Sequence, residues 1–384
     1  MKTGKRFFLV LLTAICLAGG AAAQGDTNQN TAVRPSPSLP EDFSERADGA
    51  GAAGLQEAVP EEAKNILGDV SLSDSDLGEK GLSRLGDHFE GQVFKILKSA
   101  LRQAVKLITV MILCTAACAA MSDGPVKDAV TFSGTAAVAV IAVGDAGSLL
   151  SSASATLETL SDFSKAVLPV MCSAAVGAGA VSSGAAKYAA TALFMDVLLT
   201  VGANFVLPLV SVYLAAVIAN AILPKDTLGG VSKLLKWVCT TVLTLLVLAF
   251  TTYLGLTGII TGKTDEFAAK AAKTAISTAL PVVGSTLSDA ASTLVAGAGM
   301  VRNAVGIFGL LAVAAVCLGP FLAIGVHYLI YKGVAAAAVA LADKRMAEMV
   351  DEIGSAFGLL LGLVGAGGVM LFLSLVSSMK AVTG

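Results

Sequence analysis

The side chains that could do chemistry in this sequence are few, and the most informative are polar residues within apolar stretches. Asp145 lies in one long apolar run and Asp196 in another, and Asn204 follows eight residues later. A charged side chain at the centre of a bilayer costs roughly 3 kcal/mol or more, so it usually has a function or a partner. The alternative for Asp145 is a position near a helix end, because a glycine lies within two residues on each side. These three residues are the candidate intramembrane polar sites.

The other reactive side chains favour structural roles. Cys114 and Cys118 share one helix face, but a metal ion would need further ligands. His327 stands alone in an apolar stretch, where packing is the simpler interpretation. The run Thr-Gly-Lys-Thr at 261–264 resembles the end of a phosphate-binding loop but lacks the required earlier glycine. With no Ser/His/Asp set, the sequence predicts a non-enzymatic protein without a cofactor or metal.

Composition indicates what positions these residues. The chain has 384 residues, of which 55% are hydrophobic and only 14% charged, against about 25% charged in soluble domains. The 26 Lys and Arg nearly balance the 28 Asp and Glu, which argues against a nucleic-acid-binding face. We therefore predict an all-α, polytopic membrane protein in contact with the lipid bilayer.

The N-terminal part reads as an exported segment. A basic start, an apolar run at 7–18 and small residues at 21–23 are typical of a signal peptide over 1–23. An uncleaved anchor is the alternative. Residues 24–103 are predicted to be extracytoplasmic, with 24–54 disordered and 60–103 helical. Apolar residues recur at helical spacing from Leu82 to Leu101, so this helix lies on the bilayer or the transmembrane bundle, or offers a docking surface to a partner.

The polytopic domain is expected over 104–384, with seven to nine transmembrane helices. Proline at 208 and at 320 divides two long apolar stretches, and a proline there can start a new helix or kink a continuous one. The count is left as a range for that reason. The candidate spans are 104–121, 129–150, 166–186, 188–205, 206–223, 237–260, 304–320, 321–342 and 353–376.

An internal repeat with an offset of 112 residues is a further prediction. The offset takes the Leu-Pro-Val motif of Pro169 onto that of Pro281, and Pro208 onto Pro320. These four prolines are the predicted helix-break motif of tandem copies 160–262 and 272–374. The loop 224–236 carries a net charge of +2 and the loop 343–352 a net charge of −2. Repeats of opposite orientation would explain this difference, and so would drift of loop charge.

The same charges predict an orientation. The loop 224–236 has three lysines and one aspartate, so we expect it in the cytoplasm. Cleavage of the signal peptide would leave the mature N-terminus outside. The orientation of 261–303 stays open.

Two passages resemble a known family. The run at 278–290, Thr-Ala-Leu-Pro-Val-Val-Gly-Ser-Thr-Leu-Ser-Asp-Ala, and the run at 301–310, Val-Arg-Asn-Ala-Val-Gly-Ile-Phe-Gly-Leu, are similar to stage III sporulation protein AE of endospore-forming bacteria. No catalytic motif is attached to that family, so no site role is carried over.

The resemblance implies a function that composition does not. It implies a non-enzymatic scaffold or gate subunit of the channel- or secretion-like complex between mother cell and forespore, in the mother-cell membrane around the forespore. Other membrane subunits of that complex would be partners, and the chain could form a homo-oligomer. The alternative is a small-molecule or ion transporter built on the internal repeat.

Overall fold

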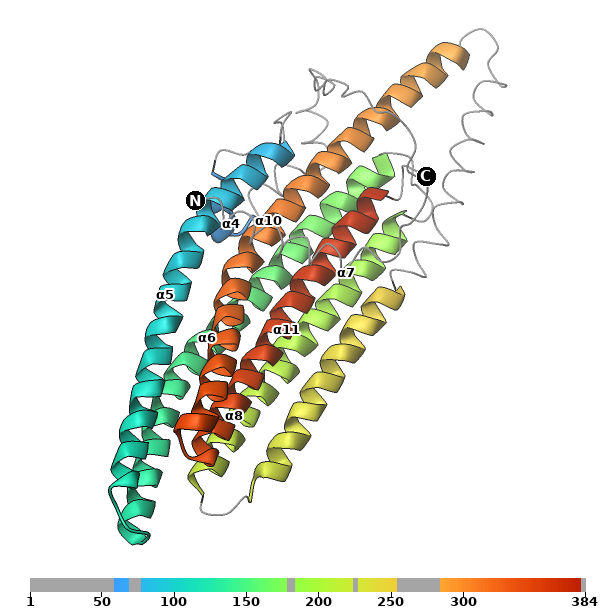
Figure 1. The fold of residues 1–384 in the computed structure, drawn as a ribbon. Coiled ribbons are helices and arrows are strands. Elements are labelled where there is room, and N and C mark those ends of the chain that lie inside the picture. The colour runs from blue at the N-terminus through green and yellow to red at the C-terminus, as the bar shows by residue number, and fades with distance from the viewer. Residues whose placement is uncertain (1–58, 69–76, 178–183, 224–226, 254–283, 381–384) are drawn as a thin grey trace, which may run out of the picture. The chain divides into compact units, whose positions relative to one another are not determined.

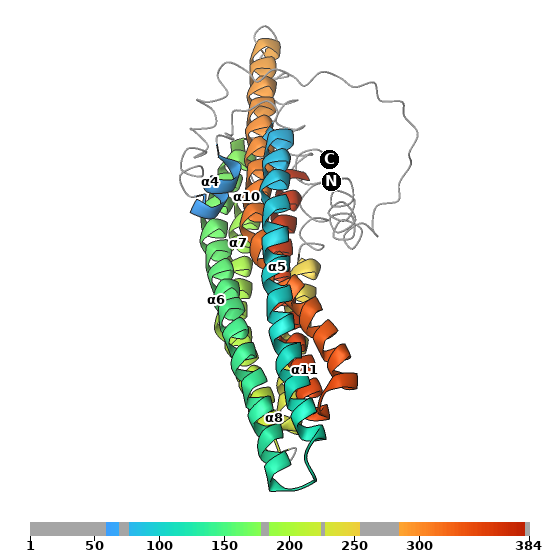
Figure 2. The same cartoon turned by 60° about the vertical axis from the view of Figure 1, so that its left-hand side comes forward.

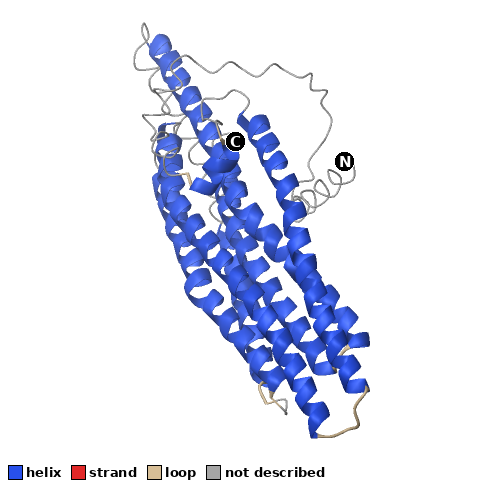
Figure 3. Cartoon of the chain, turned by 90° about the vertical axis from the view of Figure 1, so that its left-hand side faces the viewer, coloured by secondary structure: helices blue, strands red, loops and turns tan. Residues whose placement is uncertain are grey.

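The computed structural model describes residues 59–68, 77–177, 184–223, 227–253 and 284–380. All of them lie in one compact unit, Pro40–Gly384. Within these ranges the structure is helical and contains no strand (Figures 1 and 3). The elements are α4 (Glu61–Leu67), α5 (Leu77–Ala119), α6 (Pro125–Gly177), α7 (Gly184–Val201), the π-helical turn η1 (Gly202–Val206), α8 (Leu207–Ile222), an unlabelled helix Gly229–Tyr253, α10 (Gly284–Leu341) and α11 (Lys344–Lys380).

Six helices among the described residues are long and apolar enough to cross a membrane. The signal peptide and the segment 24–54 lie outside the described residues. The predicted count of seven to nine spans is not confirmed, because the described helices are longer than the predicted ones. The six helices cover Leu77–Ala119, Pro125–Val167, Leu193–Ile222, Gly229–Tyr253, Ala304–Leu341 and Lys344–Val376.

Proline does not end the helices where the sequence suggested a division. Pro320 lies inside α10 and Pro169 inside α6. Pro208 lies in the first turn of α8, directly after η1, where the backbone N–H of Leu207 donates to the carbonyl of Gly202. A π-type turn of this kind absorbs a local irregularity while the helix continues. The predicted spans 188–205 and 206–223 therefore form one continuous helical segment.

Local sequence explains where two of the helices begin. α4 starts after Pro60 with Glu61 and Glu62 in its first turn, where carboxylates favour the positive end of the helix. Gly68 follows α4 with φ of 59°, a backbone conformation that glycine adopts without strain. At the start of α11, the Asp343 carboxylate accepts the backbone N–H of Arg345 at 2.9 Å, which caps the helix.

The bundle is built around the antiparallel pair α10 and α11, which lie side by side (Figure 1). Glycines on α11 allow this close approach. A Cβ added at Gly365 would lie 3.0 Å from the ring of Phe321, and one at Gly358 would lie 3.1 Å from the ring of Tyr328. Small residues at helix interfaces are the usual route to close packing in membranes.

The first half of α5 packs on α10 (Figure 2). Leu85 and Phe89 are buried there, and Gly81 is so close to Leu311 that a Cβ would overlap it. Part of the apolar face of the predicted amphipathic helix thus lies on the bundle, whereas Leu82, Leu97 and Leu101 of the same set are exposed. The exposed surface of α5 carries polar residues together with exposed apolar ones.

The end of α5 and the start of α6, the end of α8 and the start of the helix Gly229–Tyr253, and the end of α10 and the start of α11 all lie at the same end of the bundle, the lower end in Figure 1. The Arg345 guanidinium donates to the carbonyl of Leu223 at 2.9 Å, so the start of α11 lies against the end of α8. A Cβ at Gly134 would touch Cys114 and lie 3.0 Å from Met346, which brings the α5–α6 hairpin close to the start of α11. Repeats of opposite orientation would place the end of α8 and the start of α11 at opposite ends of the bundle. The interpretation as repeats of opposite orientation is therefore wrong for these two hairpins. Drift of the loop charge is the explanation that remains for the difference in charge.

The internal repeat itself is not confirmed. Pro281, one of its four marker prolines, lies outside the described residues. Pro208 lies at the start of α8, whereas Pro320 lies in the interior of α10.

Candidate functional site

The inner half of the site is a buried carboxylate. Asp145 on α6 is 8% exposed and accepts two hydrogen bonds. The amide nitrogen of Gln103 on α5 donates to Oδ1 at 2.9 Å, and the hydroxyl of Tyr331 on α10 donates to Oδ2 at 2.7 Å. Tyr331 is completely buried and packs edge-on against Phe357. Asp145 therefore connects three helices, and each carboxylate oxygen has a donor.

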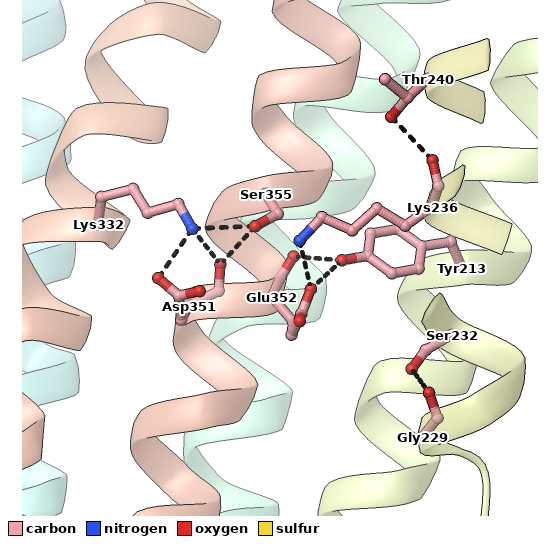
Figure 4. Close-up of polar contacts among 9 residues, drawn as sticks. All are labelled: Tyr213, Gly229, Ser232, Lys236, Thr240, Lys332, Asp351, Glu352 and Ser355. Carbon is pink, nitrogen blue, oxygen red and sulfur yellow. Dashed lines mark hydrogen bonds and ion pairs between the residues drawn. The ribbon is translucent and has the colours of Figure 1, made fainter. Parts of the chain in front are cut away.

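The outer half is a pair of acids on α11 (Figure 4). The Lys332 ammonium of α10 donates to Asp351 Oδ1 at 2.8 Å and to Ser355 Oγ at 2.9 Å. The Lys236 ammonium donates to Glu352 Oε2 at 2.9 Å. The hydroxyl of Tyr213 on α8 donates to the same carboxylate and to the Glu352 carbonyl, the latter at 3.1 Å.

Helix geometry explains why neighbouring residues serve different partners. Successive residues on an α-helix point about 100° apart. Asp351 and Glu352 are neighbours, so one meets α10 while the other meets α8 and the helix Gly229–Tyr253. Tyr331 and Lys332 are neighbours on α10, so one enters the interior and the other reaches the edge.

We call these residues together the polar layer, because they join helices at one level of the bundle. The layer links α5, α6, α8, α10, α11 and the helix Gly229–Tyr253 through charge-assisted hydrogen bonds, which are stronger than neutral ones. Its members are Gln103, Asp145, Tyr213, Lys236, Tyr331, Lys332, Asp351, Glu352 and Ser355.

An open cleft of about 1020 Å³ adjoins the polar layer on the side of the loops. Lys332, Asp351 and Glu352 lie on its wall, so the outer half of the layer borders it. Both signs of charge line the cleft, and its charged side chains beyond the layer are Lys233, Lys344, Arg345 and Glu348. The lining therefore selects no single ligand charge.

The predicted site residues do not come together. Asp196 on α7 lies 3.2 Å from the Lys165 ammonium and accepts a 3.4 Å hydrogen bond from Ser161, both on α6. Ser161 is 16 residues beyond Asp145 on that helix, a rise of about 24 Å. Asn204 is exposed in η1. Asp145 is thus interior, whereas Asp196 is a partly exposed member of an ion pair at a different depth.

Other candidates from the sequence have local partners. A ring nitrogen of His327 lies 2.8 Å from the Ala323 carbonyl of its own helix. Cys114 and Cys118 face α6, where their sulfur atoms approach the Val130 carbonyl at 3.5 Å and the Thr131 hydroxyl at 3.4 Å. In the part of the chain that the structure describes, no group of three metal-ligating side chains gathers.

Sequence reasoning missed most of the polar layer. Lys332 lies inside the predicted span 321–342 and the acids at 351 and 352 lie in the loop 343–352, so none of the three was predicted as a site residue. The available signal was the opposite charge of Lys332 and Asp351, which lie on the two sides of the connection 342–343. Tyr213, Tyr331 and Gln103 carried no signal, because their role depends on which helices are neighbours.

Comparison with known proteins identifies the family. The family model of stage III sporulation protein AE matches residues 71–381. No curated protein and no solved structure matches the chain. The match covers α5 to α11 and includes every member of the polar layer. The chain belongs to the stage III sporulation protein AE family.

Proposed function

We propose that this protein is a membrane subunit of the channel- or secretion-like complex between mother cell and forespore, with a role as scaffold or gate rather than as an enzyme. The observation that carries the proposal is the family match across most of the membrane region, which ties the chain to stage III sporulation. The complex, its other membrane subunits and the mother-cell membrane are part of the proposal.

The polar layer supports a structural role. Its carboxylates are occupied by lysine, tyrosine and glutamine donors from neighbouring helices. A catalytic site would instead aim such groups at a shared space for substrate. The donors and acceptors of this layer satisfy one another, which suits a bundle whose helices must hold a set arrangement.

The helix Gly229–Tyr253 is the best candidate for a moving part in this proposal. Only 11% of its most apolar window is buried, the lowest share among the six candidate spans in the described ranges. Polar contacts at its two ends hold it to the bundle. Lys236 pairs with Glu352 at one end, and at the other the Tyr253 hydroxyl lies 3.1 Å from that of Thr191.

Purification from sporulating cells tests the proposal. The tagged full-length chain, extracted in mild detergent, should copurify with other sporulation membrane proteins, and deletion of the chain should reduce heat-resistant spores at least a hundredfold. An unrelated polytopic protein with the same tag is the control. Normal sporulation of the deletion strain would refute the proposal, and solute uptake by the purified chain alone in liposomes would favour the transporter alternative.

A further inference from the structure

A stripe of basic side chains runs along one face of α5. Arg84, Lys95, Lys98, Arg102 and Lys106 are spaced by 11, 3, 4 and 4 residues, so at about 100° per residue they fall within about 40° of one line. All five are exposed. At 1.5 Å per residue the stripe is about 33 Å long, close to the roughly 30 Å thickness of a bilayer core. We call it the basic stripe.

Contacts with α10 set the depth of the basic stripe. Near the start of α5, Gly81 lies against Leu311 of α10. Eight residues later, Phe89 lies 3.7 Å from the position of a Cβ at Gly319 of α10. Further along, Gln103 of α5 and Tyr331 of α10 donate to the same carboxylate, that of Asp145. The stripe thus lies beside the segment 311–331 of α10, which contains no Asp, Glu, Lys or Arg. That segment belongs to a candidate membrane span. The basic stripe therefore lies level with an apolar segment of the bundle, a position that departs from the predicted extracytoplasmic placement of 60–103.

A second face of α5 supports the same depth. Phe94, Leu97, Leu101 and Val105 are 70%, 40%, 50% and 63% exposed and lie beside the stripe on the helix surface. Exposed apolar side chains in a row suit contact with lipid tails. From Phe94 to Val105, one side of α5 is therefore suited to lipid while the adjacent side carries positive charge at the same level; nearer Arg84, the exposed acids Asp87 and Glu90 occupy that side.

Hydrocarbon cannot be what the basic stripe faces. Lysines near a helix end can extend to the bilayer surface, but Lys95 and Lys98 lie in the middle of the stripe. Within the described ranges, Lys95, Lys98, Arg102 and Lys106 form no hydrogen bond or ion pair. Intramembrane charges without protein partners face water-filled cavities, and basic residues that line a pore favour anions.

We propose that the basic stripe of α5 forms one wall of a water-filled path for anionic solutes across the membrane. The proposal rests on the proposed function and specifies which surface of this subunit would meet the transported solute. One helix face cannot enclose a path, so further copies of this chain close it. Like charges on facing copies repel at short range, which keeps the stripes apart with water between them.

Neighbouring residues on α5 provide matched probes at one depth. Lys98→Cys and Leu97→Cys differ by about 1.5 Å in depth and 100° in direction, and Arg102→Cys with Leu101→Cys forms a second pair. Each is made in the full-length chain with the native cysteines replaced. The probes are an anionic and a cationic methanethiosulfonate, applied to membrane vesicles from sporulating cells.

We expect Lys98→Cys and Arg102→Cys to react at least tenfold faster than their apolar neighbours, and faster with the anionic than with the cationic reagent. Equal reaction of both members of a pair would place α5 in bulk water and overturn the proposal. Silence of both members would show that lipid or an acidic partner covers the stripe, and would overturn it too.

Spore formation by each cysteine strain separates this inference from the proposed function. A strain that sporulates normally but shows equal or absent labelling contradicts only the basic stripe. As a second measurement, Lys95→Glu with Lys98→Glu should reverse the preference for the anionic reagent at Arg102→Cys. Lys80→Glu with Glu79→Lys, which keeps the net charge near the start of α5, is the control. An unchanged preference after the double reversal would also overturn the proposal.

Discussion

At the scale of single residues, the central feature is a buried carboxylate whose two oxygens are both used. Asp145 receives one donor from α5 and one from α10. A buried donor that loses its acceptor costs about 1–3 kcal/mol. Asp145 thus stabilises the packing of three helices whatever else it does.

Replacing Asp145 separates packing from charge. Asp145→Leu leaves the buried Tyr331 hydroxyl unpaired, so we expect a loss of about 1–3 kcal/mol and a reduced protein level. Asp145→Asn keeps the shape, and Gln103 can turn its amide to accept the new donor, so the level should stay near normal. Immunoblots of membranes and thermal unfolding in detergent measure both. Equal losses for Leu and Asn would contradict this account.

A role of the two aspartates beyond packing is a separate prediction. If the charge of Asp145 or Asp196 is needed, Asp→Asn at either site lowers sporulation while the protein level stays normal, since Asn keeps the size of the side chain. Counts of heat-resistant spores from strains of matched protein level measure this effect. Normal sporulation with both Asn substitutions together would remove both residues from the list of functional sites.

We expect the Lys332–Asp351 ion pair at the edge of the polar layer to contribute only a small coupling energy to the stability of the chain. Lys332 and Asp351 are 32% and 49% exposed, and solvent weakens a pair of this kind to about 1 kcal/mol or less. We expect Lys332→Asp to destabilise the chain and the swap with Asp351→Lys to restore part of the loss. Unfolding of the single and double variants gives the coupling. Strictly additive effects would show that the pair contributes nothing.

At the scale of elements, the α10–α11 pair depends on the absence of side chains. A Cβ at Gly365 already meets the Phe321 ring, whereas a Cβ at Gly333 of α10 meets nothing within 4 Å. The glycines of α11 therefore differ in kind from glycines that face open space. The pattern of small residues indicated close packing, but only the contacts show which ones matter.

Substitution by leucine tests this difference. Gly365→Leu should push α10 and α11 apart and cost about 1–3 kcal/mol, the usual result of overpacking. Gly333→Leu is the matched control and should stay within about 0.5 kcal/mol of the original chain. Thermal unfolding of both variants in one detergent measures the effect. Equal destabilisation would show that the interface is not close-packed at Gly365.

At the scale of the whole molecule, the helix ends that lie together at one end of the bundle make a topological prediction. The α5–α6 hairpin, the end of α8 and the start of α11 must lie on one side of the membrane, because side-chain contacts join them. Cysteine at Asp123, Lys233 or Asp343, all exposed, should respond alike to an impermeant thiol reagent. A mixed response would contradict the bundle.

The direction of insertion is a further prediction from the sequence. The lysine excess at 224–236 and the signal peptide place that loop in the cytoplasm, so cysteine at Lys233 should resist the reagent in intact cells while cysteine at Ser73 reacts. Ser232 is 7% exposed, and burial alone would protect a cysteine there, so Lys233 is the better probe. Labelling at Lys233 would reverse the orientation.

The sequence by itself determined the class of this protein. Few charges and long apolar runs led to an all-helical membrane protein, and the passages at 278–290 and 301–310 led to the family that the comparison then confirmed. Such features are local, because hydropathy and short motifs are properties of a stretch no longer than one helix. They can therefore be recognised in the sequence without knowing which helices are in contact.

Only the tertiary structure decided how the helices are joined. Pro320 lies inside a helix that the sequence had divided, since a continuous helix and two short ones share the same apolar pattern. The partners of Asp145 lie 42 and 186 residues away, and no local pattern records such distances. The depth of the basic stripe likewise depends on the alignment of α5 with α10. A helix shows its own faces in its sequence, but what each face meets is a property of the assembled bundle.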